Sequence, residues 1–382
     1  MENKREFSLY VHVPFCRSKC PYCAFYSFSP RRGEMERWTA CAVRELETLK
    51  RDHLSDGAQL ATIYLGGGTP SYLPLEQWRA LCAALDELPR TADCEFTVEA
   101  NPDSVSVEKL ALWKDHGVTR VSLGVQSLDD GELKRLARPH MGDEALRAVE
   151  ACLSSGLRVS ADLMFALPDQ TLRNWHRSLS GIVRTGVTHV SVYQLTIEPD
   201  SFWGRHTPQG LPDGYAMYRW AQYYLPRKGL KQYEIASFAR EGHESRHNLA
   251  YWRRKNVLAV GPGAWGFLDG RRFASRKDLA AWAEAVENGL SPVEYEERLS
   301  GAREAGEAAV LALRTAEGID CEAFARRYGR EYLDAIEKKV RDLPDGYFLR
   351  TERGFSLSPR GMRVGNAIWS ELIGLEEGER SS

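Results

Sequence analysis

Six short runs of apolar and β-branched residues recur along the first half of the chain, each followed by a stretch with helical spacing. The runs lie at residues 8–15, 61–68, 95–101, 120–127, 158–165 and 189–195. Helical periodicity marks segments between them, such as 75–88, 143–156 and 171–186, the last two ending at glycine. Strand and helix in alternation predict a parallel sheet, because parallel neighbours need a crossover connection. Six such units fit either a doubly wound sheet or an incomplete TIM-like barrel.

Polar and glycine-rich residues gather just after these runs. Cysteines follow the first run, GGGTPS follows the second, Asn101 ends the third, and Gln126 and Ser127 end the fourth. Parallel strands have their carboxyl ends at one edge, which is where α/β barrels and open α/β sheets bind their ligands. We therefore expect one ligand at this edge to contact all of these groups.

The second half of the chain does not continue this alternation of strands and helices. With 382 residues the chain is long enough for one large domain and a smaller one. Near the end, helical stretches precede FLRTERGFSLSPRGM, which is predicted to form a hairpin with Gly354 at its turn. We predict a barrel over 1–205, its extension over 206–295, and an α+β, winged-helix-like domain over 296–382, whose tail (376–382) is disordered.

Charge and hydropathy exclude several classes of protein. The 51 basic and 53 acidic residues give a formal charge of −2, which does not favour nucleic-acid binding, even for a winged-helix-like domain. The N-terminus runs straight into a strand without the apolar core of a signal peptide. No run approaches the ~18 apolar residues of a membrane span. We expect a cytoplasmic protein that is not an integral membrane protein and binds no nucleic acid.

Three of the eight cysteines lie within the short motif CRSKCPYC: Cys16, Cys20 and Cys23. A closed zinc site or a cubane iron–sulfur cluster normally takes four protein ligands, so this motif is one ligand short. Another residue could supply the fourth, or the position is kept open for a ligand. Thiolates suit both kinds of metal centre, so the cysteines alone leave both open. The other five are expected to be ordinary small hydrophobes of a reducing compartment: Cys41, Cys82, Cys94, Cys152 and Cys321.

The glycine run after the second strand suggests what fills the open position. GGGTP, residues 66–70, removes side chains where backbone must approach a ligand closely, and it presents amides at a strand end. Tyr22, beside Cys23, could lay a flat ring against a base. A ligand with an amino acid at one end and an adenosine at the other would fit both features.

Together these motifs resemble the radical S-adenosylmethionine (SAM) superfamily, whose three-cysteine loop binds a [4Fe–4S] cluster on a partial (β/α)6 barrel. The segments that resemble one branch of it, the oxygen-independent coproporphyrinogen oxidases and haem chaperones, are YVHVPFCRSKCPYCAF, YLGGGTPSYL, FTVEANPDSV, RVSLGVQSLDD, DLMFALPDQT and HNLAYW. The likeness covers about residues 8–375. It implies an α/β fold, a partial TIM-like barrel followed by the smaller domain, with a [4Fe–4S] cluster and SAM as cofactors.

The resemblance also implies roles for single residues. Cys16, Cys20 and Cys23 would bind three irons, and SAM would occupy the fourth. The residues implied to contact SAM are Tyr10, Tyr22, Gly66, Gly67, Gly68, Thr69, Glu99, Gln126, Arg138, Asp162 and Gln194. For Gln126, Arg138 and Asp162 the alternative is a strand-end residue with local hydrogen bonds only. In family terms, one electron from the cluster cleaves SAM to methionine and a 5′-deoxyadenosyl radical. No catalytic residue is assigned.

Two differences from the coproporphyrinogen oxidases bear on whether this chain resembles them or the haem chaperones more. Phe25 stands where the coproporphyrinogen oxidases that this chain resembles have a further cysteine, and only nine residues precede Tyr10 where they have a longer extension. Both departures weaken the oxidase interpretation. The chain looks closest to the haem chaperones.

The residue types of the HNLAYW stretch, residues 247–252, are also suited to contact with haem on physical grounds. His247 offers an imidazole for haem iron, while Tyr251 and Trp252 offer flat surfaces about one helical turn away. The alternative is a helix start whose aromatic residues pack into the core. His243 is a second candidate ligand, and His12, on the first strand, is expected to be a core histidine with satisfied hydrogen bonds.

The leading hypothesis is a haem chaperone that binds haem and hands it to an acceptor haem protein of unknown identity. The alternative is a radical SAM enzyme, either a methyltransferase or a tetrapyrrole-modifying enzyme, oxygen-independent coproporphyrinogen III oxidase included. The aromatic stretch 215–224 leaves a homodimer interface open, although a core position is favoured.

Overall fold

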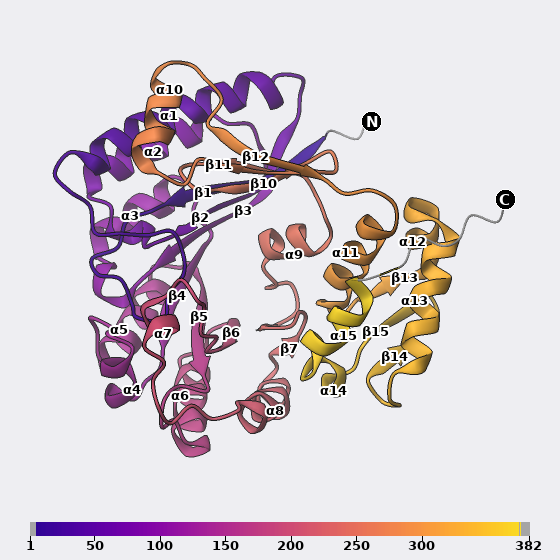
Figure 1. Cartoon of the computed structure of the whole chain (residues 1–382). Coiled ribbons are helices and arrows are strands. Elements are labelled where there is room, and N and C mark those ends of the chain that lie inside the picture. The colour runs from indigo at the N-terminus through magenta and orange to yellow at the C-terminus, as the bar shows by residue number, and fades with distance from the viewer. Residues whose placement is uncertain (1–4, 374, 376–382) are drawn as a thin grey trace.

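The computed structural model describes residues 5–373 and 375 (Figure 1). Six parallel strands stand side by side in chain order: β1 (Glu6–Val13), β2 (Gln59–Gly67), β3 (Arg90–Ala100), β4 (Arg120–Gln126), β5 (Arg158–Phe165) and β6 (His189–Gln194). All six predicted strands are confirmed. A doubly wound sheet would reverse its order at a switch point, and this one does not. The sheet is therefore the partial (β/α)6 barrel.

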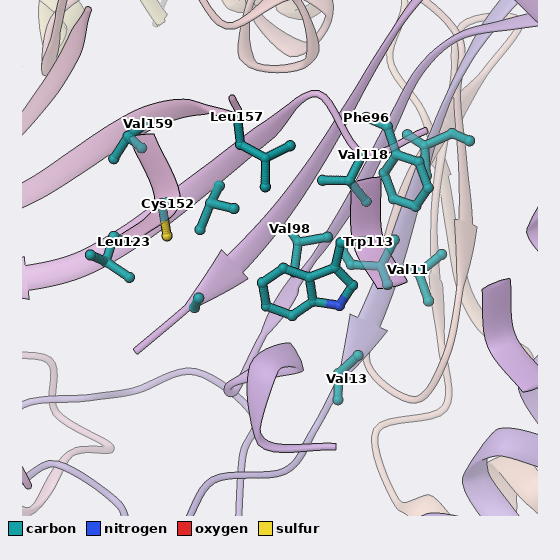
Figure 2. Packing of buried hydrophobic residues seen from close by; sticks show 14 of the residues in the cluster. Val11, Val13, Phe96, Val98, Trp113, Val118, Leu123, Cys152, Leu157 and Val159 are labelled. Carbon is teal, nitrogen blue, oxygen red and sulfur yellow. The ribbon is translucent and has the colours of Figure 1, made fainter. Parts of the chain in front are cut away.

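Helices cover the outer face of this sheet (Figure 1). They are α1 (Glu34–His53), α2 (Leu75–Asp86), α3 (Val107–Asp115), α4 (Asp130–Arg135), α5 (Gly142–Ser154) and α6 (Leu172–Arg184). Figure 2 shows the packing between these helices and the sheet. Val98 and Val159 of the strands pack with Trp113 of α3 and Cys152 of α5 in one hydrophobic core. Cys152 is thus a core residue, as predicted.

The inner face of the strands is polar at alternate positions. In β3, Phe96 and Val98 are buried in the outer core, while Glu95 and Glu99 face the inside of the barrel. Side chains of a strand point alternately to its two faces, so each strand sends one set of residues under the helices and the other set inward. The inward set makes the site described below.

The segment after β6 continues the same sheet at both ends. Its strands are β7 (Lys231–Gln232), β8 (Ser237–Ala239), β9 (Val257–Val260), β10 (Trp265–Leu268), β11 (Arg271–Ser275) and β12 (Val293–Arg298). β8 pairs antiparallel with β6, and β9 pairs parallel with β1. Its helices are α7 (Phe202–Arg205), α8 (Tyr215–Tyr224), α9 (Arg246–Trp252) and α10 (Leu279–Glu287). Within the described residues β7 and β12 are the two sheet edges, and the barrel stays open.

The aromatic helix α8 is partly core. Met217, Tyr218 and Ala221 are buried, which confirms the core prediction for one face. Tyr215 and Tyr223 are exposed, and a homodimer interface there stays a prediction. None of the described helices combines the length and the apolar character needed to cross a bilayer.

The C-terminal part has a hydrophobic core of its own. Its elements are α11 (Gly301–Leu313), β13 (Ile319–Asp320), α12 (Cys321–Tyr328), α13 (Arg330–Asp342), β14 (Phe348–Arg350), β15 (Gly354–Leu357), α14 (Pro359–Met362) and α15 (Gly365–Ile373). The first six of these elements, α11 to β15, combine three helices with a three-stranded antiparallel sheet and match the predicted winged-helix-like shape. Gly354 begins β15 after the turn, and a Cβ there would collide with the backbone of Ile319. The predicted disordered tail lies outside the described residues.

Candidate functional site

A cavity of about 410 Å³ opens at the carboxyl ends of the parallel strands, a size typical of small-molecule sites. Eleven of the residues proposed from the sequence line it: Cys16, Cys20, Cys23, Tyr22, Gly67, Gly68, Thr69, Glu99, Gln126, Arg138 and Asp162. They come from the loop after β1 and from the ends of β2 to β5, together with Arg138 after α4. The strand ends thus converge as the sequence predicts.

The cysteine loop, residues 14–28, is closed by its own backbone. The Cys16 amide donates to Phe28 O at 3.0 Å, and the Phe28 amide donates to Pro14 O at 2.9 Å. Burial raises the pKa of the Cys16 and Cys23 thiols. Across the described part of the chain, no three His, Cys, Asp or Glu side chains are arranged as a ready metal site. All three cysteines nevertheless line the wall of the same cavity.

A polar chain links two of the cysteines across this wall. Cys16 Sγ lies 3.5 Å from Thr69 Oγ1, which accepts a hydrogen bond from Asn101 Nδ2 at 3.1 Å. Asn101 Oδ1 accepts from Arg138 Nη2 at 2.6 Å, and Arg138 Nη1 donates to Cys20 Sγ at 3.6 Å. Arg138 therefore places a half-buried positive charge beside the thiols, where it would offset the charge of thiolates.

The structure shows why residues 67 and 68 of the glycine run must be glycine, which the sequence did not reveal. Gly67 has φ +113°, and a Cβ there would lie 2.5 Å from His12 Cε1. At Gly68 a Cβ would lie 2.7 Å from Phe15 O. The run is therefore constrained by the first strand beneath it as well as by any ligand above it. His12 itself is buried and bonded to Tyr10 and Tyr26, as expected for a core histidine.

Glu99 is held by two donors at the inner end of the cavity. The Tyr64 hydroxyl donates to its Oε1 at 2.7 Å, and the Gly67 amide donates to its Oε2 at 3.0 Å. Burial, followed by repulsion from Asp162, raises the pKa of Glu99 to about 7 despite these donors. The carboxyl can therefore change its charge near neutral pH when a cationic ligand arrives.

Asp162 and Gln126 continue the inner wall. The Ser122 hydroxyl donates to Asp162 Oδ2 at 2.8 Å, and burial raises the pKa of Asp162 to about 6. Gln126 ends β4 with φ +65°, a left-handed conformation that costs a non-glycine residue free energy. Strained backbone of this kind is concentrated at ligand sites.

The sequence missed three polar side chains of this wall: Tyr64, Ser122 and Tyr193. The sequence did contain a signal that could have identified these three residues. Buried parallel strands are normally apolar on both faces, whereas these strands are polar at every second position. The prediction for Gln194 has no support here, since its Nε2 donates to Asp213 O at 3.2 Å, away from the cavity. Successive residues of β6 face opposite ways, and Tyr193 takes the inward position.

Tyr10 and Gly66 lie just beneath the cavity and do not line it. The Tyr10 hydroxyl is bonded to His12 Nδ1 at 2.9 Å, and its ring stacks on Tyr64 with centroids 6.2 Å apart. A Cβ at Gly66 would lie 2.9 Å from the Tyr64 ring. Both residues support Tyr64, which in turn holds Glu99.

The HNLAYW stretch forms the floor of the barrel. His247 is 1% exposed, its Nδ1 is hydrogen-bonded to Thr62 Oγ1 at 2.8 Å, and its ring stacks on Tyr64 at 4.9 Å. Burial lowers the pKa of His247 to about 3, so the ring is neutral. Its Nε2 is buried without a hydrogen-bond partner in the described structure. Tyr251 packs edge-on against the same ring. The predicted haem ligand His247 is therefore enclosed, while Tyr251 and Trp252 are half-buried.

A buried ion pair holds this floor in place. The His247 amide donates to Glu95 Oε1 at 3.1 Å, and Arg120 Nη2 donates to Glu95 Oε2 at 3.0 Å. Arg120 also donates to the carbonyls of His243 and Glu244. Trp252 lies under the Arg314 guanidinium of the C-terminal part, at 5.3 Å. The helix α9 is thus fixed between the sheet and α11, as Figure 1 shows.

Six parallel strands in sequential order, with three cysteines at their carboxyl edge, define a radical SAM protein. Residues 10–180 match the model of the Radical SAM superfamily. Over 379 residues the chain is 31% identical to Heme chaperone HemW of Bacillus subtilis, covering 96% of this chain and 99% of the relative. It is 34% identical over 391 residues to the mitochondrial Radical S-adenosyl methionine domain-containing protein 1 of Bos taurus, covering 96% and 87%. The chain belongs to the HemW family within this superfamily.

A solved structure extends the comparison to the fold. Coproporphyrinogen III oxidase (HemN) of Escherichia coli superposes with a TM-score of 0.84 at 19% identity, covering 97% of this chain and 91% of that chain. The match includes the C-terminal part as well as the barrel. The predicted branch is therefore confirmed by sequence and by fold.

Proposed function

We propose that this chain is a haem chaperone on a radical SAM scaffold, which binds haem and transfers it to an acceptor haem protein. The observation that carries the proposal is the alignment with Heme chaperone HemW along 99% of the relative. The alignment thus includes the floor helix and the C-terminal domain, which lie beyond the part matched by the superfamily model.

The residues of the cavity suit a [4Fe–4S] cluster and SAM. Cys16, Cys20 and Cys23 would bind the cluster, since all three thiols face the cavity and Arg138 supplies a positive charge beside Cys20. The glycine run, free of side chains, would lie against SAM. When bound, the pair supplies one-electron cleavage of the SAM sulfonium.

The chain's own groups have distinct tasks in this site. Glu99, with a pKa of about 7, would accept a hydrogen bond from an ammonium or from ribose hydroxyls and gain full charge as it does so. Tyr64 orients Glu99 through its hydroxyl, and Asn101 orients Arg138. The half-buried Tyr22 ring would help to exclude water from the cofactor.

Haem titration followed by a transfer assay tests the chaperone function. Haem added to the anaerobically reconstituted protein should give a Soret band distinct from that of free haem, saturating at one haem per chain. The apo form of a respiratory haem protein should then take haem from the chain faster than a passive scavenger protein does. Absorbance that rises with haem without saturating would contradict the proposal.

The second candidate is a radical SAM enzyme. It is favoured by the complete inner wall of the cavity, where Glu99, Gln126, Arg138 and Asp162 surround space that a simple carrier does not need. Rapid formation of 5′-deoxyadenosine that depends on an added tetrapyrrole would support it. Slow cleavage, equal with and without every tetrapyrrole tried, would count against it.

A further inference from the structure

The enclosed position of His247 raises the question of which imidazole could reach haem iron. The chain has nine histidines, and the structure describes all of them. His206 is the exposed one, while the other eight are buried or half-buried. Among the described residues no side-chain hydrogen bond engages the His206 ring, whereas His12, His140 and His189 are bonded inside the barrel. His206 therefore offers a free ring nitrogen without any rearrangement.

His206 belongs to a segment, residues 195–206, that we call the flap. Thr196 and Glu198 of the flap line the cofactor cavity. The flap is anchored by Trp203, whose amide donates to Pro21 O at 2.9 Å and whose ring lies 6.0 Å from that of Tyr22 in the cysteine loop. Leu195 and Trp203 share a small buried cluster with residues of β5 and the turn after it. The flap is therefore a fixed wall of the cavity mouth, and Figure 1 shows α7 beside the strand ends.

The outer face of α7 carries an aromatic and cationic group of side chains. Phe202 is 55% exposed, and its ring centroid lies 4.6 Å from that of His206. Arg205 is exposed beside them, and it forms no ion pair with any described residue. Across the same cavity mouth, Phe25 of the cysteine loop is 68% exposed. Exposed phenylalanines next to a cavity cost free energy in water unless a flat apolar ligand covers them.

We propose that haem binds at the flap, with His206 as the axial ligand of its iron, Phe202 as the flat contact and Arg205 facing a propionate. A neutral imidazole is a common haem ligand, and a guanidinium matches the fork of a carboxylate. This assignment rests on the proposed chaperone function. It places the haem cargo at the mouth of the cofactor cavity, and it leaves His247 as a structural residue of the barrel floor.

Haem titration of matched variants tests the assignment by the Soret band. His206→Ala should lose the one-to-one Soret species and raise the Kd for haem by about tenfold or more, equivalent to at least ~1.4 kcal/mol. Free imidazole should restore the band in this variant, because it can take the vacated position on iron. Phe202→Ala should weaken binding severalfold and keep the band position. His116→Ala, which removes a half-buried histidine bonded to Asp86, is the control and should bind as wild type does.

The outcomes separate this inference from the chaperone function. A wild-type band that persists in His206→Ala would overturn the flap site and leave haem binding intact, and its loss in His247→Ala alone would return the ligand to the floor helix. Absence of a specific band in the wild type would instead overturn the chaperone function. Because His206 is exposed, its substitution should leave the melting temperature unchanged, and a drop in it would disqualify that variant in favour of His206→Gln.

Discussion

Substitution of Arg120 by methionine should destabilise the barrel strongly and loosen the helix α9, which forms its floor. Arg120 is 1% exposed and Glu95 is 4% exposed, so the change leaves a carboxylate in the interior without its cation. Two carbonyls, of His243 and Glu244, lose their donor as well. Breaking a buried pair from one side costs about 3–5 kcal/mol. Arg120 Nε and Nη1 have no hydrogen-bond partners in the described structure, so the pair is imperfectly satisfied, and we expect a value near the lower end, about 3 kcal/mol.

Thermal melting of the cofactor-free protein measures this cost. At roughly 2 °C per kcal/mol for a domain of this size, the melting temperature of Arg120→Met should fall by about 6 °C. Near-UV circular dichroism should change as well, because the rings of Tyr64, His247 and Tyr251 pack against one another. The matched control is Arg326→Met, which breaks an exposed pair with Glu322 and should cost less than about 0.5 kcal/mol.

A double variant isolates the electrostatic part of the effect. In Glu95→Gln/Arg120→Met the interior charge is gone, and the side-chain amide carbonyl introduced at position 95 can still accept from the His247 amide. We expect it to recover at least ~1 kcal/mol relative to Arg120→Met alone, as coupled neighbours do. The reasoning would be refuted if Arg120→Met cost no more than the exposed control, or if the double variant were the less stable of the two.

Four further predictions concern the cavity. Cys20→Ser should reduce iron and sulfide in the reconstituted protein to background, with Cys321→Ser as a control that retains both; equal retention would contradict the cluster assignment. Gly67→Ala should cost about 2 kcal/mol or more in denaturant unfolding, because φ is +113° and His12 is in the way. Gly57→Ala, with φ +77° and open space, should cost only about 1 kcal/mol, and equal costs would argue against the clash with His12. Asp162, whose pKa rises from 3.8 to about 6 on folding, binds its proton more tightly when folded, so its contribution to stability is full at low pH and falls as pH rises. Asp162→Asn should therefore lose about 1.4 kcal/mol less than wild type between pH 5 and pH 8 in thermal melts, and identical pH profiles would exclude the shift. Trp203→Ala should cost about 3 kcal/mol or more in denaturant unfolding, since the buried ring joins the flap to the cysteine loop, and a loss below about 1 kcal/mol would show that the flap is not anchored there.

Much of the site could be predicted because its residues follow strands at a readable position. Periodicity located all six strands, and parallel strands necessarily bring their carboxyl ends to one edge. Cys16, Gly67, Glu99 and Gln126 therefore had to converge, and they do. The prediction for Gln194 placed a residue by its strand end alone, whereas the two-residue alternation of the strand sends Tyr193 inward instead.

The floor of the barrel could not be predicted in the same way. The hydrogen bond between His247 and Thr62 joins residues 185 positions apart, and no local pattern specifies such a contact. HNLAYW has the composition of a ligand site and equally that of a buried aromatic helix. Its burial depends on the Glu95–Arg120 pair and on α11, two elements that the sequence does not connect to it.

The sequence by itself determined the strand and helix pattern, the three-cysteine loop and the glycine run, because each of these is a local signal in neighbouring residues. Tertiary structure alone decided the sequential strand order, the pairing of Tyr64 with Glu99, the enclosure of His247 and the exposure of His206. These features arise when distant segments compete to cover the same surfaces, and the outcome is set by packing and burial over the whole chain.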